Sequence, residues 1–189
     1  MKKTLMALCA VLACAVVFAQ EAAPATTPTA APAPATRAPW PVWLAFNSTK
    51  NIDVVGLRLT LPYGECEGVT GFDLGFYGRC RYFEGFQLNI LRNEALDVMG
   101  GAQVGLYNSA GRADLTGLQI GLWNEARSMR GVQVGIINVA DTVQGFQVGL
   151  INRAESMYGF QIGGVNLIRE SELAFFPIMN IGFDVFPQY

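Results

Sequence analysis

The chain has 189 residues, which suits one domain of ordinary size, and its formal charge is −2 at pH 7. Hydrophobic residues make up 51% and charged residues only 15%, well under the roughly 25% typical of soluble proteins. This balance excludes a strongly basic nucleic-acid binder, and the absence of histidine excludes a Ser-His-Asp triad, a histidine-ligated zinc or haem, and an imidazole base.

The N-terminal residues predict an export signal followed by a tether. Lys2 and Lys3 form a short positive region, residues 4–18 are mostly Leu, Ala, Val and Met, and small Ala19 allows cleavage before Gln20. About fifteen apolar residues are too few for a membrane-spanning helix, which needs roughly 20. We therefore predict a signal peptide at 1–19, and Cys14, in a loose lipobox, leaves lipidation open as an alternative. Residues 20–41, almost wholly Ala, Pro and Thr, predict a disordered tether.

Residues 42–189 form the predicted β-repeat domain, because from residue 56 the chain repeats one phrase. The copies begin at Gly56, Gly71, Gly85, Gly101, Gly117, Gly131, Gly145 and Gly159. The first, third and fifth places of the phrase are typically Gly, Gln and Gly, and the second, fourth and sixth are apolar. This alternation predicts strands with the apolar face buried, and no stretch after residue 50 has a helical period. The predicted fold class is therefore all-β.

Two all-β architectures fit this pattern. One is a parallel β-solenoid of about eight coils of 14–16 residues, and the other is an antiparallel up-and-down outer-membrane β-barrel with one repeat per strand. The third places are Arg58, Asp73, Gln87, Gln103, Gln119, Gln133, Gln147 and Gln161. In a solenoid these side chains form one ladder of stacked amides with the two opposite charges as neighbours, which favours that fold. The amphipathic segment 179–185 and the terminal aromatic residue favour the barrel.

Two cysteines bear on the same choice. Cys66 and Cys80 hold the same place in successive copies. Stacked coils would bring their Cα atoms to about 4.8 Å, within disulfide range, whereas an antiparallel meander would hold them roughly 25 Å or more apart. The solenoid therefore predicts a Cys66–Cys80 disulfide, with free thiols as the alternative. Its ends need caps, for which the candidates are residues 40–47 and residues 175–186, where Pro177 disrupts further pairing.

The phrase Gly-apolar-Gln-apolar-Gly-apolar-x-Asn-x-Ala, with the segments at 55–64 and 176–183, resembles the bacterial surface-repeat proteins first noted in leptospires and found in other diderm bacteria. The resemblance covers about residues 54–183. It implies a secreted or surface-exposed repeat protein, and it carries no catalytic residues over to this chain. The early copies depart from the phrase at Thr60, Asn89 and Arg92.

Together these patterns predict an exported, non-enzymatic β-repeat protein at the cell surface, in the outer membrane or in the periplasm of a diderm bacterium. Its role would be structural, adhesive or partner-binding, with the flat Gly-Gln-Gly ladder face as the candidate binding surface. The barrel alternative would be a pore or an anchor. No catalytic, cofactor-binding or metal-ligating residues are predicted. Envelope and host-surface components are the candidate partners, nucleic acid is excluded, and membrane association stays open.

Overall fold

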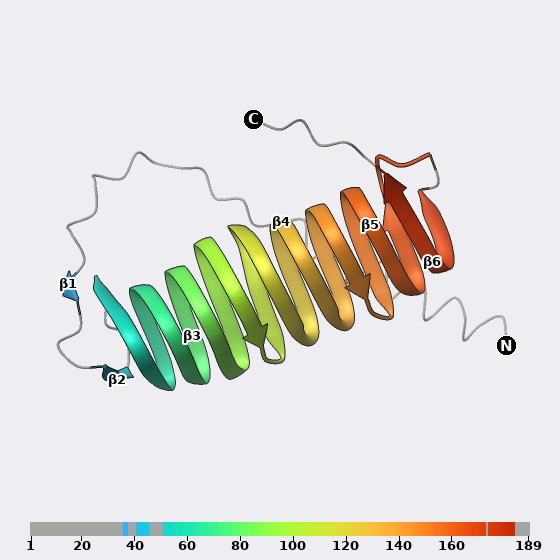
Figure 1. The fold of residues 1–189 in the computed structure, drawn as a ribbon. Coiled ribbons are helices and arrows are strands. Elements are labelled where there is room, and N and C mark those ends of the chain that lie inside the picture. The colour runs from blue at the N-terminus through green and yellow to red at the C-terminus, as the bar shows by residue number, and fades with distance from the viewer. Residues whose placement is uncertain (1–35, 38–40, 46–50, 173, 184–189) are drawn as a thin grey trace, which may run out of the picture. The chain divides into compact units, whose positions relative to one another are not determined.

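The computed structural model describes residues 36–37, 41–45, 51–172 and 174–183, and every regular element within these ranges is a β-strand. The elements are β1 (Thr36–Arg37), β2 (Val42–Ala45), β3 (Ile52–Val104), β4 (Tyr107–Val148), β5 (Ile151–Ile168) and β6 (Phe175–Phe183). The strands β3 and β4 are long because each winds through several coils, and the 18 residues of β5 make little more than one coil. Figure 1 shows these coils stacked along one axis. The predicted signal peptide (1–19) lies outside the described residues.

Successive coils pair in parallel with equivalent places side by side. Gln103 of β3 pairs with Gln119 of β4, and Gln147 of β4 pairs with Gln161 of β5. This register confirms the parallel β-solenoid of about eight coils. The alternative of an antiparallel barrel is wrong, because a meander pairs each strand with a reversed neighbour and cannot place the same residue of each repeat in one column.

The first-place glycines have an unusual backbone conformation. All eight have positive φ, between 111° and 145°, a region that residues with a Cβ rarely adopt. They also stack directly on one another: a Cβ added to Gly131 would lie 2.0 Å from the carbonyl oxygen of Gly117 in the preceding coil. Glycine is therefore required here both by backbone conformation and by the close approach of neighbouring coils.

The interior of the solenoid is filled by four columns of side chains. Two columns are polar, formed by the third-place residues and by the eighth-place asparagines. Of the two apolar columns, one is small-sided and consists of Cys66, Cys80, Ala95, Ala110, Ala126, Ala140 and Ala154. The other is larger-sided and consists of Val69, Phe83, Met99, Leu115, Met129, Val143 and Met157. All these apolar side chains are at most 4% exposed, so the core extends unbroken along the coils.

Both ends of the solenoid are capped by short strands. At the N-terminal end, β2 pairs in parallel with Leu57–Thr60, and Trp43 packs against the core. At the other end, β6 reverses direction and pairs antiparallel with β5. The described parts of both predicted caps are therefore confirmed, while Trp40, Phe46 and residues 184–186 lie outside the described ranges. The predicted tether (20–41) needs one correction, because Thr36 and Arg37 form a strand that pairs with Ile52 and Asp53.

Candidate functional site

The third-place column does not form a surface, which corrects the sequence-based prediction of a ladder face. The residues Arg58, Asp73, Gln87, Gln103, Gln119, Gln133, Gln147 and Gln161 are all 0% exposed. From Gln103 onwards, each Nε2 donates a hydrogen bond of 2.8–2.9 Å to the Oε1 of the preceding coil. Because the amides satisfy one another, the column can be buried without the usual penalty for unpaired polar groups. It therefore stabilises the stack and offers nothing to a partner.

A second polar column runs beside it. Its members are Asn93, Asn108, Asn124, Asn138, Asn152 and Asn166, all fully buried. Here each Nδ2 except that of Asn166 donates to the Oδ1 of the following coil at 2.7–2.8 Å, so the two ladders point in opposite directions. Each of these asparagines except the last also donates to a backbone carbonyl of the following coil, for example Asn124 to Val134 at 2.9 Å. These asparagines therefore cross-link neighbouring coils within the interior.

With glutamine and glycine facing inward, the apolar places of the phrase face outward. We call this surface the apolar face and define it by the second, fourth and sixth places of the eight coils. Its members are Leu57, Leu59, Leu61, Phe72, Leu74, Phe76, Phe86, Leu88, Ile90, Ala102, Val104, Leu106, Leu118, Ile120, Leu122, Val132, Val134, Ile136, Phe146, Val148, Leu150, Phe160, Ile162 and Gly164. None is buried, and the exposed fraction reaches 57% at Phe72 and 61% at Leu150. The prediction that these apolar places are buried is therefore wrong.

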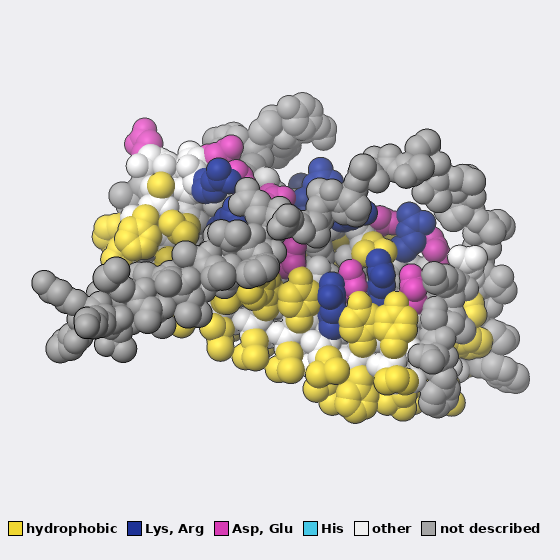
Figure 2. All heavy atoms as spheres, turned by 180° about the vertical axis from the view of Figure 1, so that it is seen from behind, with side chains coloured by type: hydrophobic (Ala, Val, Ile, Leu, Met, Phe, Trp, Pro, Cys, Tyr) yellow, Lys and Arg dark blue, Asp and Glu magenta, His cyan; other side chains and the backbone are white. Residues whose placement is uncertain are grey.

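The apolar face is continuous along the solenoid and carries no charged or polar side chain. Figure 2 shows hydrophobic side chains gathered along one edge, next to a band of basic and acidic ones. With coils about 4.8 Å apart and alternate residues about 7 Å apart, eight coils give a face of roughly 40 Å by 20 Å. That is on the order of 800 Å², above the 300–600 Å² of the largest apolar patch on a typical soluble monomer. A face of this size marks an interaction surface.

Over the first five coils, one edge of the apolar face is bordered by an aromatic column, and in the last three coils the equivalent places are Ile137, Ile151 and Val165. We call this column the aromatic border: Tyr63, Tyr77, Arg92, Tyr107 and Trp123. The rings of Tyr63 and Tyr77 are 4.7 Å apart, those of Tyr107 and Trp123 are 6.4 Å apart, and the Arg92 guanidinium lies between the two pairs, 5.7 Å from Tyr77 and 4.6 Å from Tyr107. The cation thus continues the stack of rings through a cation–π contact on each side.

The border turns away from the apolar face at a coil corner and ends in carboxylates. The amides of Leu122 and Trp123 both donate to the carbonyl of Leu106, which marks that corner. Beyond it, tyrosine hydroxyls donate to acidic side chains, Tyr77 to Glu94 at 2.8 Å and Tyr107 to Glu125. Burial and the hydrogen bond to Glu94 raise the pKa of Tyr77 to about 12, so its hydroxyl stays a proton donor at neutral pH.

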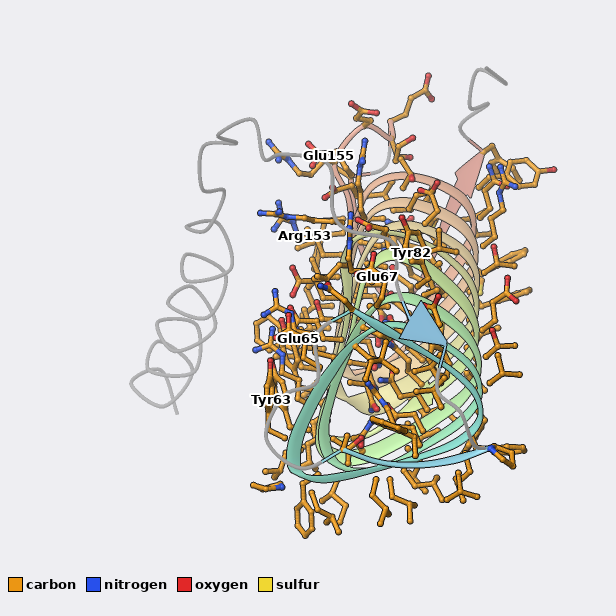
Figure 3. The ribbon with its side chains drawn as sticks, turned by 90° about the vertical axis from the view of Figure 1, so that its left-hand side faces the viewer. Tyr63, Glu65, Glu67, Tyr82, Arg153 and Glu155 are labelled. Atoms are coloured by element: carbon orange, nitrogen blue, oxygen red, sulfur yellow. The ribbon has the colours of Figure 1, made fainter. Side chains whose placement is uncertain are left out.

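Charged residues follow on the side beyond the border, and several of them form ion pairs. Arg81 contacts Glu67 at 3.1 Å and Asp97 at 2.8 Å, and Arg169 contacts Glu155 at 3.0 Å. In the axial view of Figure 3, Tyr63, Glu65 and Arg153 project from one side of the coils. These exposed pairs contribute little stability, about 0–1 kcal/mol each, but together they give this side a mixed charge of both signs.

The N-terminal coils hold a buried ion pair. Arg58 donates to Asp73 through Nε at 2.8 Å and Nη2 at 2.5 Å, and both side chains are fully buried. Burial alone would raise the pKa of Asp73, but the hydrogen bonds and charge of Arg58 hold it below its usual value. The pair takes the space that asparagine fills elsewhere: a Cβ on Gly78, at the asparagine place, would lie 2.4 Å from Asp73 Oδ2 and 3.0 Å from Arg58 Nη2. The predicted adjacency of these opposite charges is confirmed.

The predicted Cys66–Cys80 disulfide is absent, because both cysteines are free thiols. Cys66 Sγ accepts a hydrogen bond from Arg58 Nη1 at 2.6 Å, and Cys80 Sγ instead faces the carbonyl of Glu94 at 3.7 Å. Burial raises the pKa of Cys66 to about 11, despite the neighbouring Arg58 charge, and burial also raises the pKa of Cys80. Both thiols are therefore protonated and inert at neutral pH, and they fill the small-sided column that alanine fills elsewhere.

A pocket of about 500 Å³ lies at the N-terminal coils, away from the apolar face. It is lined by apolar residues such as Val54 and Phe83 and by four polar ones, Asp53, Thr70, Tyr82 and Glu84. Among the described residues, no group of three or more Cys, Asp or Glu side chains could hold a metal ion, and no helix is both long and apolar enough to span a membrane.

Searches against family models, curated proteins and solved structures found no match to this chain. The function of the site must therefore be inferred from its own geometry.

The sequence predicted the alternating columns correctly, but it placed the apolar side chains inside and the glutamines outside, which is the reverse of the structure. It also missed the place of Arg92 in the aromatic border. The signal for Arg92 was obscured because this coil carries an extra residue, and the register shifts between Glu94 and Val98. Once the coils are aligned, Arg92 pairs with Tyr107 and belongs to the column.

Proposed function

We propose that this chain is an exported, non-enzymatic protein of the bacterial envelope, and that its solenoid is a rigid scaffold attached through the apolar face. The observation that carries the proposal is the unbroken apolar character of three outward columns over eight coils. Exposing so much apolar surface to water is unfavourable by about 25 cal/mol per Å², so the arrangement is stable in use only when something covers it. The interior ladders supply the rigidity that such a scaffold needs.

A structural or adhesive role is supported by where the polar chemistry lies. The third-place amides and the Arg58–Asp73 pair are consumed in hydrogen bonds inside the stack, and the two thiols are buried and protonated. Export is supported by the basic and apolar N-terminus with its small residue at Ala19.

The test compares two matched double variants produced from the full chain in the same cell. Leu122→Glu with Ile136→Glu places two carboxylates on the apolar face, and Ser128→Glu with Thr142→Glu places two on the other side of the same coils. Circular dichroism checks that both are folded. We expect the apolar-face variant to leave the envelope fraction for the soluble exported fraction, and the control to stay.

Equal distribution of the two folded variants would contradict attachment through the apolar face. Export is read separately, from the N-terminus of the recovered protein. We expect it to begin at Gln20, and a cytoplasmic chain that still begins at Met1 would contradict the export proposal.

A further inference from the structure

We propose that the occupant of the apolar face is the hydrocarbon surface of a lipid bilayer, on which the solenoid lies along its length. This proposal rests on the proposed function, because it names what the attachment face attaches to. It concerns a lipid surface that the protein lies on, with the coils outside the membrane. Three properties of the face and its border favour lipid over a protein partner.

The first property is the complete lack of charge on the apolar face. A protein–protein interface of standard size carries on the order of ten hydrogen bonds between the partners, and side chains on both sides must supply them. The second, fourth and sixth places of the coils supply none, since all are Leu, Ile, Val, Phe, Ala or Gly. A surface without donors, acceptors or charges is complementary to hydrocarbon, which has none either.

The second property is the layering of chemistry away from that face. The aromatic border comes next, with ring bodies beside the apolar columns and the hydroxyls of Tyr77 and Tyr107 bonded to Glu94 and Glu125. Tyr and Trp gather at membrane–water interfaces because they are apolar at one end and polar at the other. Beyond the border the charges of both signs follow, such as Arg81 with Glu67 and Asp97. Over the first five coils, the apolar, aromatic and mixed-charge layers therefore follow one another in the order found from the hydrocarbon of a bilayer to its surface.

The third property is the backbone. In lipid, an unpaired N–H or C=O group is costly, which excludes open sheet edges from the hydrocarbon. The apolar face is the flank of a ladder whose coils hydrogen-bond to one another from β3 through β4 to β5. Both ends of this ladder are covered, by β2 and by β6. The face can therefore touch hydrocarbon with its side chains while its backbone groups stay paired within the sheet.

A second copy of the chain is the competing occupant. The face, at roughly 800 Å², matches the area that each partner buries in a standard protein interface, so area alone does not separate the two. The lack of charged and polar groups on the face favours lipid over a second copy, because an interface between copies gains specificity from polar contacts that this face cannot make. The experiment is therefore built to separate lipid from a second copy directly.

The test uses an environment-sensitive fluorophore at two places in one coil of the exported chain. Ile136→Cys puts the label on the apolar face, and Asp141→Cys puts it on the opposite, exposed side, with the unsubstituted protein as the labelling background. Vesicles are phosphatidylcholine, with and without phosphatidylglycerol, and a parallel set has brominated acyl chains. We expect a blue shift and bromine quenching at position 136 and neither at position 141.

Charge on the face supplies a quantitative readout. Leu122→Glu with Ile136→Glu is expected to weaken vesicle binding by about tenfold or more, because carboxylates would have to enter hydrocarbon. The Ser128→Glu with Thr142→Glu control is expected to bind as the parent does. Binding of the parent is expected to persist in high salt, since contact with hydrocarbon is not screened.

The outcomes separate the two proposals. A blue shift at position 136 that appears without vesicles and grows with protein concentration would assign the face to a second copy, overturning the lipid proposal while leaving attachment intact. A label at position 136 that stays in water with vesicles present would also overturn the lipid proposal. If the charged apolar-face variant then still left the envelope fraction in cells, the occupant would be another protein. If it did not, the proposed function would fail as well.

Discussion

Breaking the buried ion pair is the sharpest test of how the first coils are held. Asp73 accepts five hydrogen bonds: two from Arg58 and one each from Thr60 at 2.8 Å, Gln87 at 2.8 Å and Asn89 at 2.9 Å. Asp73 therefore links Arg58 in the preceding coil to Gln87 in the following coil, where the glutamine ladder begins. The substitution Asp73→Asn removes the negative charge and leaves Arg58, fully buried, without a counter-charge.

Removing one partner of a buried pair typically costs about 3–5 kcal/mol, because the remaining charge is uncompensated. With a urea m-value of about 2 kcal/mol per M, this lowers the unfolding midpoint by roughly 1.5–2.5 M. The assay is urea unfolding followed by circular dichroism, with hydrogen exchange to locate the loss. We expect exchange to rise first in the coils that begin at Gly56 and Gly71, since these contain the pair.

The pH dependence gives a second measure of the same interaction. The pKa of Asp73 is lowered in the folded state, so its contribution to stability is present above its unfolded value of about 4 and is lost as the pH falls through the folded value. The stability gap between the parent and Asp73→Asn should therefore be constant at neutral pH and narrow in acid. A gap that does not change below about pH 4 would contradict the assignment of a charged carboxylate.

A rescue variant distinguishes the loss of the ion pair from a general loss of folding. Arg58→Gln with Asp73→Gln continues the glutamine ladder into the first two coils, as in the coils that follow. We expect this double variant to recover at least about 2 kcal/mol relative to Asp73→Asn, because no buried charge remains. If Asp73→Asn itself stayed within about 0.5 kcal/mol of the parent, the change expected of an unimportant surface site, the pair would not hold these coils.

Three further changes probe the repeat. Gly131→Ala should lower the free energy of unfolding by about 3 kcal/mol or more in urea, since the strain of positive φ adds to a clash with the preceding coil. Gln119→Leu should cost about 2–4 kcal/mol, because it leaves one buried donor and one buried acceptor unpaired, whereas Ile120→Gln, which points outward, should stay within about 1 kcal/mol. Cys66 and Cys80 should resist a thiol reagent at pH 8 in the folded protein and react fully in urea, as counted by mass spectrometry.

Each of these has an outcome that would refute it. A Gly131→Ala variant as stable as the parent would mean that the coils do not approach as closely as described. Equal costs for Gln119→Leu and Ile120→Gln would mean that the third place does not face the interior. Rapid labelling of either thiol in the folded protein would contradict the burial of the small-sided column.

Much of the architecture follows from the spacing of particular residues. The recurring phrase predicted eight equivalent coils, and the structure gives the first-place glycine of every copy a positive φ. The recurring third place predicted a stacked column, and Arg58 beside Asp73 predicted that copies lie next to one another in parallel. The disulfide could not be decided this way, because equivalent places only bring Cys66 and Cys80 close. Whether they bond depends on where each Sγ points, and Cys66 faces Arg58.

Only the tertiary structure decided which side chains of each coil face the interior. A period of two says that side chains alternate between two sides, but it does not say which side is inside. Here the usual rule is reversed, because stacked coils let Gln and Asn amides satisfy each other along the axis, so a polar interior has little cost. Bulky residues such as Phe72 and Leu150 are left outside. The sequence determined the repeat, its register and its caps, and the packing of coil on coil determined that its apolar face looks outward.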